Sequence, residues 1–344
     1  MRIKRVKKKL PISVILFGLA FLTFLASWAE VFPEQTVEKI YFRVLFPRIS
    51  YAFGGMSDAM PVSWLDIWIL VGVALLIYAC LRRRWRLLLG AVSVLYLWFF
   101  WGWGLNYHRP AVGSRLKLDT TSLEKSDFEQ FTDTAVQEIN RLYPVASALT
   151  AQSPLDRNAI STIASSRVDR VVFGIDGIEW RAATRVKRSR LAEFWYKSAG
   201  IDGMFNPFGH EPLVIDGPLP FELPFLMAHE IAHVRGIANE GEANLIALLA
   251  TVTSEDPRFQ YSGWLHLWGY LRNAPMARLD EGPKADLRAV RERVLSHHIP
   301  IVGNFQTSLL DAHLKANAVP GGIRSYSDFV ALAIASQPRW KDFQ

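Results

Sequence analysis

Apolar residues are concentrated near the start of the chain, in three runs that contain few charges. These runs cover residues 10–29, 63–81 and 87–104. A helix needs about 20 apolar residues to cross a bilayer, so we expect residues 1–104 to form a membrane anchor with three transmembrane helices. From Leu105 onward the composition is that of an ordinary folded domain, which we expect to span residues 105–344.

The pattern outside these runs is mixed, and helical periodicity dominates it. Residues 30–62 are amphipathic and interrupted by Pro and Gly, so we expect a loop with a short helix there. Further helices are expected at 123–143, 261–271, 284–297, 302–316 and 326–335. Strands are predicted within 168–185 and 200–220, including 203–208 and 213–215, and their edge could pair with an extended peptide. The predicted fold class is α+β and mainly helical.

The net charge of +7 comes from two short clusters. Those clusters are Arg2, Lys4, Arg5, Lys7, Lys8 and Lys9, and then Arg82, Arg83, Arg84 and Arg86. The rest of the chain holds 29 basic and 32 acidic residues, a net charge of −3, which argues against a nucleic-acid partner. Positive clusters stay on the cytoplasmic side of a membrane. Three crossings would then place residues 105–344 outside the bacterial cytoplasmic membrane in a multi-pass topology.

Two features of the anchor have alternative interpretations, and its single cysteine excludes two kinds of site. Ser27-Trp28-Ala29 resembles a signal-peptide cleavage site, but we favour an uncleaved anchor because Trp28 fits poorly beside a cleavage point. Asp66 could act inside the membrane, although its place near the interface favours snorkelling. Cys80 is the only cysteine, so neither an intrachain disulfide nor a thiolate zinc site can form.

The candidate chemistry lies in His229-Glu230-Ile231-Ala232-His233. On a helix the two histidines project from one face, four residues apart, and can bind one tetrahedral zinc ion. Glu230 lies beside them and can accept a proton from a zinc-bound water, as hydrolysis requires. We therefore expect a zinc hydrolase with Glu230 as its catalytic base.

The third ligand is expected from the helix that follows. Gly236 can end the first helix, and Asn239 can cap a second one that starts at Glu240. On that helix Glu240 and Asn244 share a face, so Glu240 is the predicted ligand, and Asn244 could hold a ligand histidine. Glu242 is the reserve candidate. Alternatively, both glutamates only favour the positive end of a helix dipole.

Other polar residues are candidates by residue type alone. A zinc hydrolase needs a donor for the developing oxyanion, and His210, Tyr261 and His266 are suitable. Asn106, Tyr107 and Arg109 follow the third apolar run and could anchor at the interface or form the floor of the site, of which we favour anchoring. His297 and His298 could bind metal, but a pair at a helix end more often interacts with the dipole.

Several separated motifs resemble the domain of unknown function 3810 family. They are Leu105-Asn106-Tyr107-His108-Arg109-Pro110, residues 203–208, residues 229–236, Glu240-Gly241-Glu242-Ala243-Asn244, Tyr261-Ser262-Gly263 and Ser325-Tyr326. The resemblance implies a bacterial membrane protein with a zincin-like metallopeptidase domain. The site is also similar to that of gluzincins, although Asn244 and the short turn at Gly236 depart from their pattern. A metzincin would need a third histidine at position 239, where this chain has Asn, so the pattern argues against a metzincin.

The expected function is hydrolysis of peptide bonds in a peptide or protein substrate by a membrane-embedded zinc metallopeptidase. Zn²⁺ would be held by His229, His233 and Glu240. One alternative is a non-catalytic, zinc-binding envelope sensor or scaffold, against which the complete Glu230 argues. Another is an intramembrane protease, against which the charged residues just after the motif argue.

Overall fold

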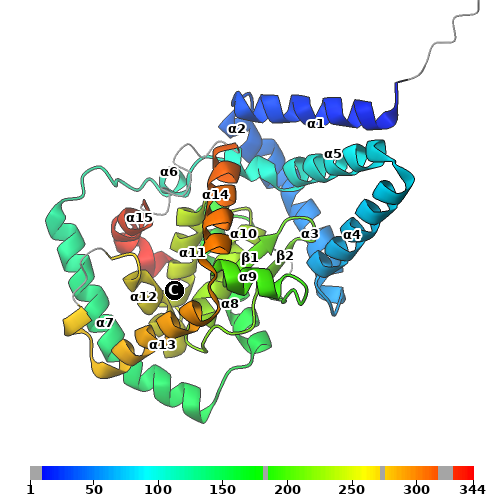
Figure 1. Ribbon diagram of the computed structural model, residues 1–344. Helices are drawn as coiled ribbons and strands as arrows, with labels where there is room; N and C mark the ends of the chain where they lie inside the picture. The colour runs from blue at the N-terminus through cyan, green and yellow to red at the C-terminus, as the bar shows by residue number, and fades with distance from the viewer. Residues whose placement is uncertain (1–9, 181–184, 272–275, 317–327) are drawn as a thin grey trace, which may run out of the picture.

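The computed structural model describes residues 10–180, 185–271, 276–316 and 328–344. In these parts the chain is mainly helical, with one small sheet (Figure 1). The centre is the pair α10 (Leu223–Val234) and α11 (Glu240–Val252), against which α8 (Arg157–Asp176), α12 (Pro257–Trp268) and α15 (Asp328–Ser336) pack. This pair carries the zinc motif, so the candidate ligands lie on the most enclosed helices of the fold.

The apolar helices form a separate arm on one side of the molecule (Figure 1). They are α1 (Ile12–Trp28), α4 (Trp64–Arg82) and α5 (Trp85–Gly102). Among the described residues, two helices, α4 and α5, are long and apolar enough to cross a membrane. The expected third, α1, has only 17 residues, because Pro11 precedes its first turn. It packs along α5, whereas α4 diverges from α5.

The segment between α1 and α4 is helical rather than a loop with one short helix. It contains α2 (Glu34–Thr36), the π-helix η1 (Val37–Leu45) and α3 (Phe46–Ala59). Phe42 and Phe46 are fully buried in the main core. The guanidinium of Arg109 lies 3.0 Å from the centre of the Phe42 ring, a cation–π contact. The core of the domain therefore includes residues that precede the second apolar run.

Two long helices complete the helical part of the fold: α8 packs on the central pair, and a second helix packs on α12. The helix expected at 123–143 is confirmed as part of α7 (Lys125–Gln152), which packs on α12. The strand expected from Val171-Val172-Phe173 is wrong, because these residues lie in α8. Val168, Val171 and Val172 are fully buried at the i, i+3 and i+4 positions of one helical face. Burial on that face outweighs the β preference of valine.

The single sheet lies beside α10 and consists of β1 (Gly203–Asn206) and β2 (Glu211–Val214). The strands are antiparallel, with Gly203 opposite Val214 and Phe205 opposite Pro212. This hairpin confirms the strands expected within 200–220. On its other side, β2 pairs with Lys187, whose N–H donates to the Pro212 carbonyl and whose carbonyl accepts from Val214 N–H.

The remaining elements complete the C-terminal half. The expected helices at 261–271, 284–297, 302–316 and 326–335 are confirmed as α12, α13 (Glu281–His297), α14 (Pro300–Ala316) and α15, although residues 326–327 lie outside the described residues. The short elements are η2 (Gly104–His108), α6 (Val112–Arg115), α9 (Glu193–Ala199), η3 (Met276–Arg278) and η5 (Gln337–Phe343). In Figure 1, α14 stands next to the sheet.

Candidate metal centre

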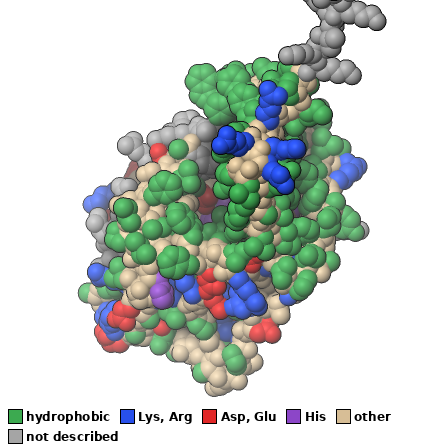
Figure 2. Space-filling view, turned by 45° about the vertical axis from the view of Figure 1, so that its right-hand side comes forward, with side chains coloured by type: hydrophobic (Ala, Val, Ile, Leu, Met, Phe, Trp, Pro, Cys, Tyr) green, Lys and Arg blue, Asp and Glu red, His purple; other side chains and the backbone are tan. Residues whose placement is uncertain are grey.

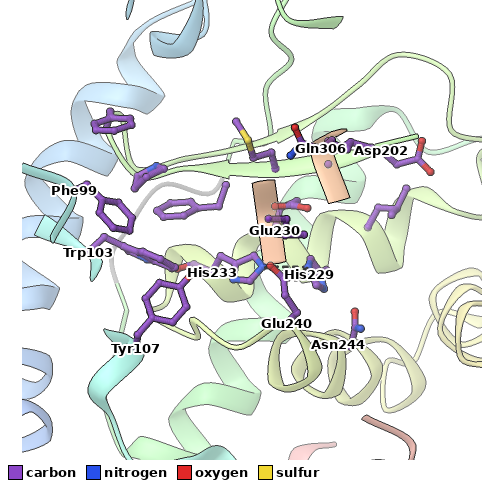
Figure 3. A pocket seen from close by; sticks show the side chains of 18 of the residues that line it. Phe99, Trp103, Tyr107, Asp202, His229, Glu230, His233, Glu240, Asn244 and Gln306 are labelled. Atoms are coloured by element: carbon purple, nitrogen blue, oxygen red, sulfur yellow. Dashed lines mark hydrogen bonds and ion pairs between the residues drawn. The ribbon is translucent and has the colours of Figure 1, made fainter. Parts of the chain in front are cut away.

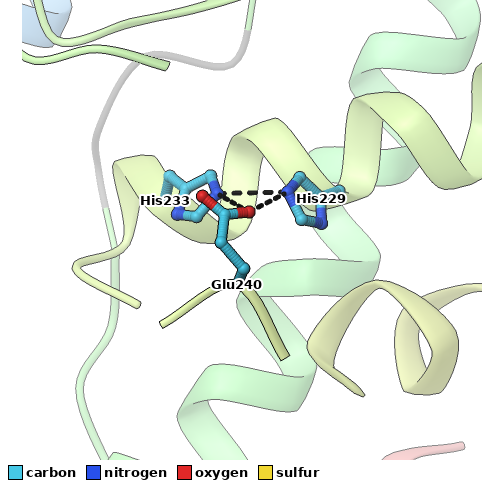
Figure 4. Close-up of side chains that lie close together, drawn as sticks. All are labelled: His229, His233 and Glu240. Carbon is cyan, nitrogen blue, oxygen red and sulfur yellow. Dashed lines mark hydrogen bonds and ion pairs between the residues drawn. The ribbon is translucent and has the colours of Figure 1, made fainter. Parts of the chain in front are cut away.

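The two histidines of the motif lie one turn apart on α10 and point to the same side (Figure 4). Their Nε2 atoms are 3.1 Å apart. The opposite face of α10 carries Met227, Ala228 and Ile231, all fully buried. Packing of that face fixes the rotation of the helix, so both imidazoles are directed into the space above α10.

The turn after α10 brings the next helix back to the histidines. Gly236 has a φ of 78°, and the N–H of Ile237 donates to the carbonyl of Ala232, so the helix ends as the sequence predicts. A Cβ at Gly236 would lie 2.8 Å from the Phe46 ring. Asn239 then caps α11 by accepting a hydrogen bond from Glu242 N–H at 3.2 Å.

Of the two candidate glutamates, Glu240 lies against the histidines. Its Oε2 is 3.2 Å from His229 Nε2 and 3.5 Å from His233 Nε2 (Figure 4). Glu242 points away and accepts a hydrogen bond from Val112 N–H at 2.5 Å. Among the described residues, His229, His233 and Glu240 form a cluster that could hold a metal ion.

The spacing of these donor atoms fits zinc. Two donors bound to one tetrahedral zinc ion at about 2.0 to 2.1 Å lie roughly 3.3 Å from each other. The observed separations of 3.1, 3.2 and 3.5 Å bracket that value. His233 Nδ1 is 2.7 Å from the Ile237 carbonyl. That carbonyl accepts a hydrogen bond from Nδ1–H, so in the neutral ring the Nε2 lone pair is directed at the metal position.

Burial and mutual charge shift the pKa values within the cluster. Burial raises the pKa of Glu230 to about 7, while the neighbouring histidines oppose the rise. Burial also disfavours the charged form of Glu240, but His233 and His229 outweigh it and hold the pKa of Glu240 below its usual range. Burial likewise opposes the charge on His233, yet Glu240 raises the pKa of His233 to about 9. The histidines therefore keep Glu240 ionised, as a metal ligand must be.

Glu230 lies between β1 and the histidines (Figure 3). Its side chain is buried, and a Cβ built at Gly203 would lie only 2.5 Å from Glu230 Oε1. A side chain at position 203 would therefore displace the carboxylate. The absence of a side chain at Gly203 therefore leaves room for the Glu230 carboxylate. This contact joins segments that are distant in the sequence, so the residues around Gly203 do not predict it.

The cluster lies in a cleft of about 890 Å³, bounded by β1 on one side and α10 on the other (Figure 3). Phe99 and Trp103 lie at the end of the cleft next to α5, and Asp202 and Gln306 at the other end. The size is typical of a pocket that binds a ligand or peptide.

One edge of β1 faces away from β2. Pro212 and Val214 use their backbone groups to pair with Lys187 on the far side of β2. Gly203 and Phe205 lie opposite them, so in an antiparallel ladder their own N–H and C=O groups point away from β2. Within the described parts of the chain, no strand pairs with this edge of β1.

The chain matches the family model described as "Protein of unknown function (DUF3810)" over residues 41–334. It belongs to this family. The match confirms the resemblance stated from the motifs, and it begins within η1, inside the segment that packs into the core. No curated protein and no solved structure matches the chain. The family description names no activity, so catalysis stays a prediction.

The residues after the third apolar run support the site rather than anchoring at an interface. Trp103 Nε1 donates to the His233 carbonyl at 3.0 Å. Arg109 donates to the Gly236 carbonyl at 3.0 Å and pairs with Glu38 and Asp176. Asn106 and Arg109 are buried, and Tyr107 lines the cleft. The favoured prediction of interface anchoring is therefore wrong. Tyr107 fits the site-floor alternative, whereas Asn106 and Arg109 are not among the residues that line the cleft.

Two of the three candidate oxyanion donors lie outside the cleft lining. His210 is fully buried beside Phe205, and Tyr261 donates to Asp286 at 2.7 Å. His266 does line the cleft, stacked on Phe225 with ring centres 3.7 Å apart. Burial, followed by the charge of His229, lowers the pKa of His266 to about 3. His266 is therefore neutral near pH 7.

Sequence reasoning missed a tyrosine in the same wall. Asn244 donates to Tyr270 Oη at 3.3 Å instead of holding a ligand histidine, so its predicted role is wrong. Because Tyr270 accepts this bond, its hydroxyl hydrogen remains able to donate to a group in the cleft. Tyr270 follows α12 and reaches the site by packing of α12 on α11. No local spacing signals such a contact.

Proposed function

We propose that this protein is a membrane-anchored, zinc-dependent peptidase that hydrolyses peptide bonds outside a bacterial cytoplasmic membrane. The observation that carries the proposal is the set of three donor atoms at zinc spacing beside a buried carboxylate, Glu230. A purely structural zinc site has no need of a general base next to its ligands. The free edge of β1 alongside them supports a peptide as the substrate.

Each side chain has a stated task in this mechanism. His229, His233 and Glu240 would hold zinc, which when bound activates a water for attack and polarises a carbonyl. Glu230 takes a proton at its carboxylate and returns it to the leaving amine. Gly203 and Phe205 orient an extended peptide by backbone hydrogen bonds. His266 and Tyr270 are the candidates for stabilising developing negative charge from the wall of the cleft. The placement of β1 beside α10 supports a zincin-like domain.

The proposed topology has three membrane helices, with the basic clusters in the cytoplasm. The exposed side chains of α4 and α5 are largely apolar, as lipid contact requires (Figure 2). At 17 residues, α1 reaches the lower limit of about 17 residues for a span. Ser27 Oγ lies 3.0 Å from His108 Nε2 and is buried. Cleavage near Ser27 would remove this contact and the packing of α1 on α5, which supports an uncleaved anchor.

A substitution of the base tests the mechanism. Purified Glu230→Gln should keep its zinc and its melting temperature, while cleavage of a peptide library falls by about 10²–10⁴-fold, the usual contribution of a general base. Zinc is measured by mass spectrometry and cleavage by the appearance of new termini. Cleavage at the wild-type rate would show that the mechanism is wrong. Absence of wild-type cleavage, together with unfolding by a chelator, would favour the envelope sensor or scaffold.

The proposed topology has a separate test. A tag at the C-terminus should be degraded when protease is added to intact spheroplasts, because three crossings from a cytoplasmic N-terminus place it outside. A tag at the N-terminus is the matched control and should be protected. Protection of the C-terminal tag would overturn the proposed side of the membrane.

A further inference from the structure

The cleft that holds the metal cluster continues along one face of α5. The residues of α5 and of the segment that follows it that line the cleft are Val92, Leu95, Tyr96, Phe99 and Trp103. They recur at intervals of three and four, so they form one stripe along the helix. Phe24 of α1 borders the same stripe. Val92 is 64% exposed, so the stripe is accessible to a molecule in the cleft.

This stripe reaches deep into the apolar arm. Helices rise 1.5 Å per residue, so Val92 lies about 15 Å along the axis from the end of α5 at Gly102. That distance is about half of a hydrocarbon core of about 30 Å. An occupant of this part of the cleft would therefore lie among lipid chains, and its surface must be apolar.

The stripe leads directly to the metal ligands. Trp103, at its outer end, donates a hydrogen bond to the His233 carbonyl, and Phe205 of β1 packs against Trp103 with ring centres 5.1 Å apart. From there the cleft continues between β1 and α10 to Asp202 and Gln306 (Figure 3). A single extended molecule could therefore contact α5 and the metal cluster together.

The two parts of the cleft require different chemistry of the same occupant. The α5 stripe offers only aliphatic and aromatic contacts, apart from the hydroxyl of Tyr96. The outward N–H and C=O groups of Gly203 and Phe205 require a partner that both accepts and donates hydrogen bonds at strand spacing. A lipid acyl chain satisfies the first requirement but not the second, whereas a polypeptide with an apolar segment satisfies both.

We propose that the substrates are membrane-inserted polypeptides: an apolar segment lies along the α5 stripe, and the adjoining extended segment pairs with β1 over the metal cluster. The proposal rests on the proposed function and narrows its substrate class. The scissile bond would then lie within a few residues of the membrane surface, since Trp103 links the end of the stripe to His233. A soluble peptide would occupy only the part of the cleft between β1 and α10.

Photo-crosslinking tests this docking without relying on catalysis. The probe is a synthetic polypeptide with about 20 apolar residues, followed by an extended segment of mixed sequence. Glu230→Gln protein in nanodiscs carries a photoreactive residue at position 92 or, as the matched control, at position 94. Val94 is also exposed on α5 but does not line this cleft. We expect crosslinks to the apolar segment from position 92 and not from 94. Equal crosslinking from both positions would overturn the proposal.

Cleavage kinetics provide the second test. Three substrates share one extended segment, which is attached to an apolar helix, to a phospholipid or to nothing. Val92→Trp should lower kcat/KM for the helical substrate by about tenfold, a loss of about 1.4 kcal/mol in transition-state binding, and leave the soluble peptide unchanged. Val94→Trp should change neither.

The outcomes separate this proposal from the proposed function. Equal losses with the lipid-linked and the helical substrate would show that the stripe binds any apolar chain and would overturn the polypeptide assignment. No effect of Val92→Trp on an active enzyme would overturn the docking and leave the peptidase intact. Crosslinking from position 92 without cleavage by the wild type would support docking and contradict the peptidase.

Discussion

One wall of the cleft is lined by residues between Phe225 and Asn244 on α10 and α11, whereas the rest of the lining is assembled from distant segments, α5, β1, α12 and α14. The first wall carries the candidate metal ligands and the proposed base, Glu230. The second carries the β1 edge and the apolar stripe. Donor atoms for a metal need tolerances of a few tenths of an ångström, which two helices joined by a short turn provide. Binding of the proposed substrate would need a large contact area, and segments from distant parts of the sequence supply that area.

The largest expected effect is on zinc affinity, which should depend on Glu240 but not on Glu242, the other glutamate in the first turn of α11. Glu240→Gln should weaken zinc binding by more than about 100-fold, because even outer partners of a zinc ligand contribute 10–100-fold. Glu242→Gln is the matched control and should keep its zinc, since Glu242 bonds Val112 N–H instead of facing the histidines. Zinc is measured by competition with a chromophoric chelator. Zinc loss in Glu242→Gln alone would reassign the third ligand.

The next effect concerns the buried ion-pair network beside the Gly236 turn. Arg109 is buried and pairs with Glu38 at 2.9 Å and Asp176 at 3.2 Å. Arg109→Met should lower the free energy of unfolding by about 3 kcal/mol, the lower end of the range for a broken buried pair. Glu38 and Asp176 lose the buried cation that bridges them and keep only Arg43 and Arg115, which are less buried. Arg141→Met removes an exposed pair with Glu138 and should cost less than about 1 kcal/mol. Denaturant unfolding in one detergent measures both, and equal losses would contradict the network.

An effect of pH on the free energy of unfolding is expected from His210, which is fully buried beside Phe205 of β1. Burial lowers the pKa of His210 from 6.5 to about 4. The unfolded chain therefore binds this proton first as the pH falls. The stability from neutral His210 is fully present above pH 6.5 and is lost as the pH falls toward 4. Between pH 7 and pH 4.5 the wild type should lose about 2 to 3 kcal/mol through this group.

The control for this effect removes the titration but keeps the ring. His210→Phe places an apolar ring among Phe46, Phe53 and Phe205, which already surround position 210. The free energy of unfolding is compared for both proteins at the two pH values. If His210→Phe lost as much stability on acidification as the wild type, acid sensitivity would have to arise from other groups.

The smallest effect is expected at Gly203, where β1 packs directly against the Glu230 carboxylate. Gly203→Ala places a methyl group against Glu230 Oε1 and should lower turnover by about tenfold through displacement of the carboxylate. Zinc content should not change, since the ligands lie on the other wall. Gly55→Ala, where a Cβ has no neighbour within 4 Å, should leave turnover unaffected. Wild-type turnover in Gly203→Ala would show that the base tolerates the shift.

The sequence predicted the contiguous wall and little of the assembled one. His229, His233 and Glu240 could be placed together because helical spacing and a glycine turn determine their geometry over a few residues. Gly203 and Tyr270 could not, since both contacts arise from packing between distant segments. Asn244 was predicted on the correct face of α11, yet its partner, Tyr270, comes from the turn after α12.

The fold shows the same division. Long amphipathic helices such as α7 and α13 were predictable because their apolar periodicity extends over several turns. The strand predicted in α8 failed because Val171 and Val172 favour strands locally, whereas the buried face of the helix is set by packing on α10 and α11. The helices between α1 and α4 were missed because Phe42 and Phe46 bury their rings against residues that follow much later in the chain.

The close packing of Phe46 against Gly236, together with the Arg109 bond to the Gly236 carbonyl, bears on how this architecture can evolve. The turn between the candidate ligands is braced by Phe46, which precedes α4, and by Arg109, which follows α5. Residues 105–344 would therefore not make an independent module that recombination could transfer to another anchor. Insertions that separate the two regions would disturb the turn, so the apolar arm and the rest of the fold should be inherited as one unit.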